Sequence, residues 1–320
     1  MPSIVQLSYL IAVNRTRHFG RAAAQLGVSQ PTLSMQIQKV ERELGVAIFD
    51  RQKKPIETTD RGRAILERAW DVVSAHENLM RLADGNFAGP AGKFGLGIIP
   101  TLAPYVLPWF LRNFAEAFPA VELSIFERPT DELLSEVHTG RLDAAILATP
   151  LRERSIKERV LFYDPFYVYC HGEDPLLEAE FVEVEDLDPT KLWLLDDAHC
   201  FRAQVVNFCG LQERTHLGSI RFAGGSFETI RHLIDASEGY TLIPETYART
   251  LPKSVRQRCV RAFETRSPTR EVSLVHHHKS WKLDITEALQ DSVAKTTPRS
   301  LRQVGPEGEI LSIELPRELD

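Results

Sequence analysis

A chain of 320 residues is long for one domain, so we expect two or three, and its 43% hydrophobic and 26% charged residues are those of an ordinary soluble globular protein. The longest uncharged stretch, residues 94–111, is broken by three prolines and makes a poor membrane span, while the N-terminus lacks the layout of a secretory signal, which favours the cytoplasm. Four cysteines are too few for a disulfide-stapled scaffold.

Residues 1–60 are mildly basic, with eight Lys/Arg against five Asp/Glu, whereas the rest of the chain is acidic. Apolar residues between Leu7 and Val13 predict a first helix, and residues 19–26 predict a short second one. Residues 27–29 form a turn, and Ser29 is a plausible N-cap for a third helix. The buried stripe of that helix is predicted at Leu33, Ile37, Val40 and Leu44.

This layout is typical of a helix-turn-helix, in which short polar side chains near the start of the second helix reach base edges. A charged segment between residues 49 and 59 predicts the β-wing of the same domain. The residues predicted to contact DNA are Ser29, Gln30, Pro31, Thr32, Ser34, Gln36, Arg51 and Lys53, with Lys39 and Lys54 as further candidates. The alternative is a three-helix structural domain with a solvated basic loop.

The string from Ala22 to Ser34, together with Leu44-Gly45, Phe49-Asp50-Arg51 and Thr58-Thr59, closely resembles the N-terminal domain of LysR-type transcriptional regulators. After it, residues 60–84 show an apolar period near 3.5, which predicts a dimerising linker helix. A long surface helix packed on the body is the alternative. The segment 85–90 is expected to be a hinge.

The body alternates short apolar strands with helices, which implies a parallel sheet with covered faces, and strands near residues 160 and 270 are expected to cross between two subdomains. We expect a regulatory domain over 90–297, with one α/β subdomain of about 90–161 and 267–297 and a second of about 162–266. The fold class is therefore α/β with an N-terminal winged helix-turn-helix (1–59), a linker (60–89) and two doubly wound subdomains. The resemblance to the family implies a fold like that of periplasmic binding proteins. Residues 298–320 are predicted to be a tail with little structure.

Cys200 and Cys209 stand nine positions apart, with His199 before the first and Arg202 after it. This segment resembles the OxyR branch of the family, the peroxide sensors. Further matches are Thr101, Thr130 and Arg270, which in that branch correspond to groups lining the peroxide pocket. The resemblance implies that Cys200 is the reactive thiol and Cys209 its resolving partner. Cys170 and Cys259 are expected to be core residues.

Physical chemistry is compatible with these roles. Peroxide reacts with a thiolate, which His199, Arg202, Arg270 or a helix N-terminus would favour at Cys200. Hydroxyl groups at Thr101 and Thr130 suit a small polar ligand, although Thr130 could also cap a helix. If residues 200–209 are helical, their ends are separated by about 13.5 Å, beyond the 4.4–6.8 Å typical of a disulfide, so oxidation must remodel the segment.

The sequence thus predicts a peroxide-responsive transcriptional regulator that binds double-stranded promoter DNA and hydrogen peroxide. The expected partners are further copies of the same chain, most simply as a dimer of dimers, with RNA polymerase as another candidate and no membrane. No cofactor and no metal are expected, and His276, His277 and His278 are predicted at a solvated edge. One alternative is a family member that responds to a small organic effector. Another is a thiol peroxidase or zinc enzyme.

Overall fold

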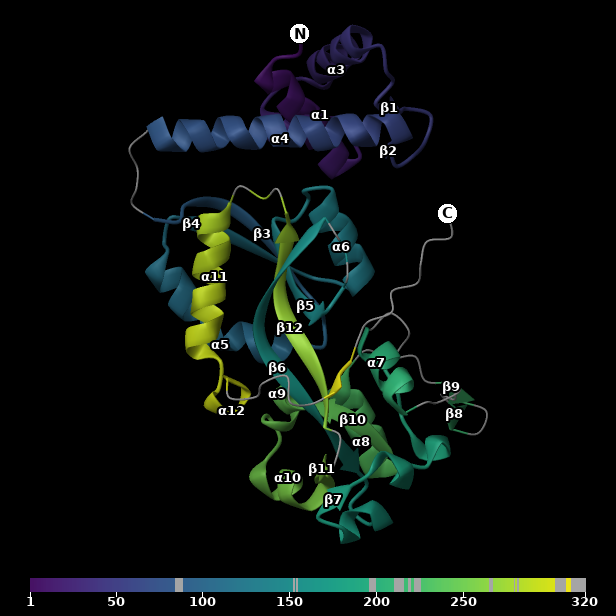
Figure 1. Ribbon diagram of the computed structural model, residues 1–320. Helices are drawn as coiled ribbons and strands as arrows, with labels where there is room; N and C mark the ends of the chain where they lie inside the picture. The colour runs from purple at the N-terminus through teal and green to yellow at the C-terminus, as the bar shows by residue number, and fades with distance from the viewer. Residues whose placement is uncertain are drawn as a thin grey trace. The chain divides into compact units, whose positions relative to one another are not determined.

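In the computed structural model, the described residues are 1–83, 89–151, 153, 155–195, 200–209, 216–217, 220–221, 226–264, 267–278, 280, 282–302 and 309–311 (Figure 1). They divide into two compact units. Unit 1 comprises residues 1–89, 136–143 and 277–283, and unit 2 comprises residues 90–135, 144–276 and 284–320.

The N-terminal part of unit 1 is a small bundle of helices with a two-stranded wing. Its elements are α1 (Ile4–Thr16), α2 (Phe19–Leu26), α3 (Gln30–Leu44), β1 (Phe49–Asp50) and β2 (Glu57–Thr58). The wing strands pair antiparallel, with Phe49 opposite Thr58. The predicted stripe on α3 is confirmed at Leu33, Ile37 and Val40, which are fully buried. Leu44 differs because it is the last residue of α3 and is 40% exposed.

Local signals place the ends of α3. The Ser29 hydroxyl accepts a hydrogen bond from the backbone N–H of Thr32 at 3.2 Å, so Ser29 is the N-cap that the sequence predicts. At the other end Gly45 has φ of 65°, the left-handed conformation that glycine adopts without strain. The ends of the helix that bears residues predicted to contact DNA are therefore set by its own sequence.

The linker helix α4 (Asp60–Ala83) has two different halves. Near its start, Leu66 and Ala69 are buried, and α4 packs on α1. Farther along, Val73 is still buried, whereas Val72, Leu79 and Met80 are 46%, 62% and 48% exposed. The second half therefore presents apolar surface that the described residues of the same chain leave uncovered.

Unit 2 is built on a mixed sheet in the order β4-β3-β5-β12-β6-β11-β7, with β10 paired to β6 and β13 to β12. Its strands are β3 (Gly92–Ile98), β4 (Val121–Glu127), β5 (Ala144–Thr149), β6 (Ile156–Cys170), β7 (Phe181–Val182), β10 (Tyr240–Pro244), β11 (Val260–Phe263), β12 (Pro268–His277) and β13 (Glu309–Ile310). Two further strands, β8 (His216–Leu217) and β9 (Ile220–Arg221), form a separate pair.

The sheet is parallel only in part. β3 pairs parallel with both β4 and β5, as the alternation of strands and helices predicts. The two long strands β6 and β12 cross from one half of unit 2 to the other (Figure 1), and here the pairing of β12 with β5 and of β10 with β6 is antiparallel. These antiparallel pairs are a departure from the parallel sheet that the alternation predicts, and they occur at the strands that cross between the two subdomains.

The remaining helices lie between these strands along the chain. They are α5 (Ala103–Ala117), α6 (Thr130–His138), α7 (Cys200–Cys209), α8 (Phe227–Ala236), α9 (Glu245–Ala248), α10 (Lys253–Cys259), α11 (Leu283–Thr296) and α12 (Arg299–Arg302). Three short 3₁₀ turns cover 175–178, 184–186 and 189–191.

Two parts of the predicted C-terminal tail, residues 298–302 and 309–311, have defined structure, which the sequence did not predict. Leu301 of α12 is 1% exposed, and β13 pairs in parallel with β12. Leu311 belongs to the hydrophobic core of unit 2, and its carbonyl accepts a 2.9 Å hydrogen bond from the amide of Gln204 in α7. Two leucines in a charged segment are thus buried, and the apolar surface that each removes from water stabilises these parts of the segment.

Candidate functional site

The start of α3 offers a polar face. Ser29, Gln30, Pro31 and Thr32 are all exposed. The Ser29 and Thr32 hydroxyls lie 2.7 Å apart, so this pair serves the cap and still presents oxygen atoms outward. Such a face has the form that base edges in the major groove require. Met35 is also 57% exposed on this helix. The sequence pattern does not identify it as a surface residue, because methionine is usually a core residue.

Three of the residues predicted to contact DNA also hold the domain together. Arg51 donates to the Ser34 hydroxyl at 3.1 Å and forms an ion pair with Glu41 at 2.9 Å. The side-chain amide of Gln36 accepts a 2.9 Å bond from Gln6 of α1. Ser34, Gln36 and Arg51 therefore connect α3 to the wing and to α1, whereas Lys53 is exposed on the wing and pairs with Glu57. The assignment of these side chains to DNA remains a prediction.

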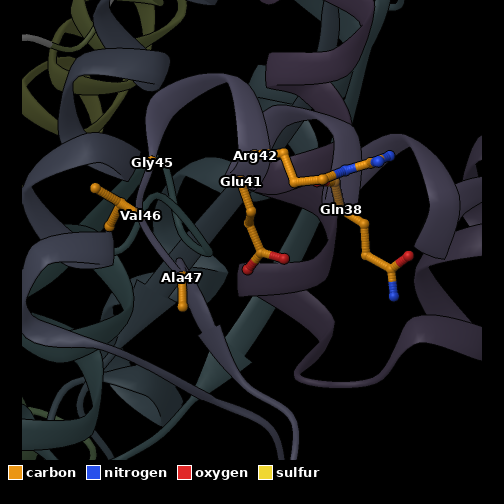
Figure 2. A pocket seen from close by; sticks show the side chains of 6 residues that line it. All are labelled: Gln38, Glu41, Arg42, Gly45, Val46 and Ala47. Carbon is orange, nitrogen blue, oxygen red and sulfur yellow. The ribbon is translucent and has the colours of Figure 1, made fainter.

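Figure 2 shows a hollow at the C-terminal end of α3, lined by Gln38, Glu41, Arg42, Gly45, Val46 and Ala47. Its carboxylate, Glu41, accepts the backbone N–H groups of Ile48 and Phe49 at 2.9 and 3.2 Å and pairs with Arg51. These bonds fix the course of the chain from α3 into the wing. The hollow is therefore a consequence of the turn, and its carboxylate is engaged in the fold.

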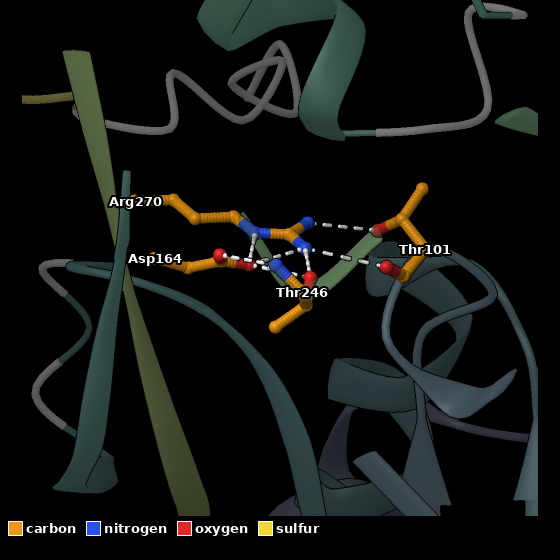
Figure 3. A network of polar contacts seen from close by, with 4 residues as sticks. All are labelled: Thr101, Asp164, Thr246 and Arg270. Atoms are coloured by element: carbon orange, nitrogen blue, oxygen red, sulfur yellow. Dashed lines mark hydrogen bonds and ion pairs between the residues drawn. The ribbon is translucent and has the colours of Figure 1, made fainter. Parts of the chain in front are cut away.

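A buried polar network lies in unit 2 (Figure 3). Arg270 of β12 is fully buried and forms an ion pair at 2.9 Å with Asp164 of β6, which is fully buried as well. Its guanidinium also donates to the Thr101 hydroxyl at 3.1 Å and to the Thr101 carbonyl at 3.3 Å. Thr246 completes the network through bonds to both charged groups. The structure thus brings together two of the predicted pocket residues, Thr101 and Arg270.

Thr130 occupies the equivalent place on the neighbouring strand. Thr101 follows the end of β3 by three residues, Thr130 follows the end of β4 by three, and Ile98 pairs with Glu127 where these parallel strands end. Ligands in open α/β sheets bind beyond such carboxyl ends. The Thr130 hydroxyl is buried and makes no hydrogen bond to the described part of the chain. Thr130 is the first residue of α6, and since its hydroxyl bonds to none of the described residues, it is available there as donor and acceptor.

The two cysteines of interest are the first and last residues of α7. Nine helical steps separate their Cα atoms by about 13.5 Å, which is about twice the longest separation that a disulfide spans. His199 lies outside the described residues, as do the side chains of Cys200, Arg202 and Cys209. The helical backbone agrees with the geometry that the sequence argument assumed, and the roles of these side chains remain predictions.

Phe201, the residue after Cys200, anchors the start of α7. It is 2% exposed, and its ring lies 4.7 Å from that of Phe166 and 5.0 Å from that of Phe227. The Arg270 guanidinium carbon is 5.6 Å from the same ring centroid, which is within the range of a cation–π contact. One side chain therefore ties the cysteine-bearing helix to the buried Arg270 network.

Two tyrosines extend this aromatic group. The ring of Tyr247 stacks on Phe227 at 5.3 Å and lies 5.6 Å from that of Tyr105. Tyr105 donates to Glu228 at 3.0 Å, and burial together with this carboxylate raises its pKa well above the ordinary value, although Arg270 acts in the opposite direction. Tyr105 is therefore a neutral donor at physiological pH and adds no charge to the site.

Comparison with known families settles the class of the protein. Residues 4–63 match the model of the bacterial regulatory helix-turn-helix proteins of the lysR family, and residues 87–297 match the LysR substrate binding domain. The chain belongs to the LysR family. As a helix-turn-helix regulator of this family it is a DNA-binding protein that regulates transcription and not an enzyme. The fold class and the family resemblance predicted from the sequence are both confirmed.

Several relatives of this LysR-family protein carry a name that refers to peroxide. It is 35% identical to the "Hydrogen peroxide-inducible genes activator" of Dickeya chrysanthemi, over 91% of this chain and 94% of the relative. A full-length OxyR variant from Pseudomonas aeruginosa matches with a TM-score of 0.80 at 30% identity, covering 93% of this chain and 99% of that one. An H2O2-bound OxyR variant from Corynebacterium glutamicum matches with a TM-score of 0.59 at 28% identity, covering 92% of each chain.

The other cysteines and the three consecutive histidines of this regulator lie outside the polar network around Arg270. Cys170 and Cys259 are free and buried, and burial raises the pKa of the Cys170 thiol to about 12. His276 is 3% exposed, which corrects its predicted place at a solvated edge, because β12 is an interior strand of the sheet. His277 and His278 have ring centroids 4.6 Å apart, since His278 lies in the turn after the strand.

The described residues also bear on metal binding and on membrane insertion. No group of three or more His, Cys, Asp or Glu side chains is arranged there to hold a metal ion. Among the helices in the same residues, none combines the length and the apolar character that a membrane crossing requires. What the sequence reasoning missed in the site is Asp164, Thr246 and the anchoring role of Phe201. Asp164 precedes a proline in an apolar strand, and no local pattern marks it as the partner of Arg270.

Proposed function

We propose that this LysR-family regulator senses hydrogen peroxide through Cys200 and controls transcription through a disulfide between Cys200 and Cys209. The observation that carries this proposal is the placement of both cysteines at opposite ends of α7, whose first turn is anchored beside the Arg270 network. The names of the relatives support the same ligand. A disulfide cannot close across an intact ten-residue helix, so bond formation and loss of α7 would be one event.

The chemistry requires two steps. The thiolate of Cys200 attacks one oxygen of the peroxide, the O–O bond breaks, and the products are a sulfenic acid and hydroxide, which takes up a proton to give water. The thiol of Cys209 then displaces the hydroxyl from the sulfenic sulfur, and water leaves as the disulfide forms. Position one of a helix favours the thiolate at Cys200, because the helix dipole is positive there.

The hydroxyl groups of the predicted pocket residues suit the ligand. Thr101 accepts from the guanidinium and keeps its own hydroxyl hydrogen for donation, and the unbonded Thr130 hydroxyl can both donate and accept. Hydrogen peroxide offers two donors and several lone pairs in a volume close to that of two water molecules. These groups can therefore orient the peroxide without a metal or an organic cofactor.

Remodelling of α7 would disturb more than the cysteines. Phe201 is fixed among aromatic rings, and Gln204 bonds to the carbonyl of Leu311. Both contacts depend on helical spacing, so unwinding releases them together and repacks this face of unit 2. In the homo-oligomer that we propose, most simply a dimer of dimers, this change would reach the DNA-binding units. The exposed apolar residues Val72, Leu79 and Met80 of α4 supply a contact surface for a second copy.

The decisive experiment is mass spectrometry of peptides spanning residues 192–214, before and after a stoichiometric amount of hydrogen peroxide. We expect a Cys200–Cys209 crosslink in the wild type, a persistent sulfenic acid in Cys209→Ser, and neither product in Cys200→Ser. Cys170→Ser is the matched control, and it should crosslink as the wild type does. A response to peroxide that survives Cys200→Ser would exclude Cys200 as the sensor, whereas a wild-type protein that shows no response to peroxide would favour a regulator controlled by a small organic effector.

A further inference from the structure

The charge of Arg270 is already balanced from within the protein. Its Nε and one terminal nitrogen both donate to Oδ2 of Asp164, at 3.0 and 2.9 Å, and both side chains are fully buried. Arginine does not lose its proton in proteins, and a buried charge without a partner is strongly unfavourable. Asp164 is therefore the counter-ion that allows this cation to sit in the core.

Thr246 locks the carboxylate in place. Its backbone N–H donates to Oδ1 of Asp164 at 3.0 Å and its hydroxyl donates to Oδ2 at 2.8 Å. The neighbouring carboxylate, Glu245, is engaged elsewhere, with Arg256 at 2.6 Å. Four donors thus hold the two oxygens of Asp164, and the carboxylate cannot swing aside to leave Arg270 open to another anion.

One side of Arg270 remains directed at the ligand groups. The second terminal nitrogen donates to the Thr101 hydroxyl at 3.1 Å, so the guanidinium offers direction and hydrogen bonding there. Its net charge toward an incoming ligand is cancelled by Asp164 at contact distance. A thiolate at Cys200 would add a negative charge to the same region and disfavour an anion further.

We propose that Asp164 is a specificity-determining residue, which neutralises Arg270 so that the site beside Thr101 takes a small uncharged hydrogen-bonding ligand and rejects small carboxylates. This inference rests on the proposed function, since it describes the ligand class of the same site. It also separates the two kinds of effector, because an arginine free of a counter-ion would be the natural receptor for an organic acid.

The test uses the full chain and formate, a carboxylate of about the size of peroxide. Thermal unfolding is followed with sodium formate and with sodium chloride at equal ionic strength. We expect the same unfolding temperature in both salts for the wild type, and stabilisation by formate in Asp164→Asn, with an affinity at least tenfold above that of the wild type. Asp164→Glu keeps the charge and should not respond, and the double variant D164N/R270Q should lose the response.

Two results would overturn the proposal: a folded Asp164→Asn that ignores formate, or a wild-type protein that formate stabilises in a manner lost in Arg270→Gln. Should Asp164→Asn fail to fold, the wild type decides. Its rate of Cys200 oxidation by hydrogen peroxide should be equal in formate and in chloride, and competitive slowing by formate would contradict us.

The two proposals fail in different ways. If hydrogen peroxide leaves Cys200 of the wild type unoxidised, the proposed function is wrong. The formate titrations of the wild type and of Arg270→Gln do not depend on oxidation. They still show whether Asp164 prevents anions from binding to Arg270.

Discussion

Replacement of Phe201 by alanine should shift the redox equilibrium of the cysteine pair. In the reduced protein the Phe201 ring is buried against Phe166 and Phe227, and it can keep those contacts only while α7 begins where it does. Closing a disulfide across α7 would remove the helix and, with it, this packing. The substitution therefore weakens the reduced form and leaves the oxidised form largely unaffected.

The size of the effect follows from the burial. Truncation of a buried phenylalanine to alanine costs about 3–5 kcal/mol. For a two-electron couple, about 30 mV corresponds to 1.4 kcal/mol, so full loss of the packing on oxidation lowers the reduction potential by about 60–110 mV. The disulfide of Phe201→Ala should thus be harder to reduce than that of the wild type.

A redox titration in glutathione buffers, read by mass spectrometry of the 192–214 peptide, measures this potential. Phe110→Ala is the matched control, because Phe110 is equally buried but lies in α5. The control should lower the unfolding temperature by a similar amount and leave the potential unchanged. Equal potentials for Phe201→Ala and the wild type would refute the reasoning, because the ring would then keep its place when the bond forms.

Three further predictions concern stability. Ser29→Ala removes the cap of α3 and should lower the free energy of unfolding in urea by about 1 kcal/mol, whereas Ser29→Asn can still cap the helix and should retain most of the wild-type stability. Equal stability of all three proteins would exclude a capping role. Leu311→Ala should destabilise the protein by about 2–5 kcal/mol, because Leu311 is 6% exposed in the core of unit 2, and a loss below 0.5 kcal/mol would show that the C-terminal segment does not hold α7. Burial raises the pKa of the Cys170 thiol to about 12 from 9.0, so the unfolded chain loses this proton at lower pH than the folded chain, and the free energy of unfolding should fall as the pH rises above 9. In Cys170→Ala this fall between pH 9 and 10.5 should be shallower, and an unchanged dependence of stability on pH would contradict the raised pKa.

Much of this protein's secondary structure could be predicted from local patterns in the sequence. The periodic apolar residues of α3, its Ser29 cap and the Gly45 stop are readable in sequence because each depends on neighbours within four positions. The same holds for the alternation of strands and helices in unit 2 and for the spacing of Cys200 and Cys209. The resemblance to the LysR family rests on such short strings as well, and it led to Thr101 and Arg270.

Tertiary structure decided which of these residues meet. Arg270 finds Asp164 across 106 positions and Thr101 across 169, and Gln204 reaches Leu311 across 107. No local sequence pattern predicts such pairs, because the order of the strands in the sheet determines which carboxylate lies beside a buried cation. Sheet order is set by the packing of the whole domain, and a buried cation must find a counter-ion there or the fold is lost.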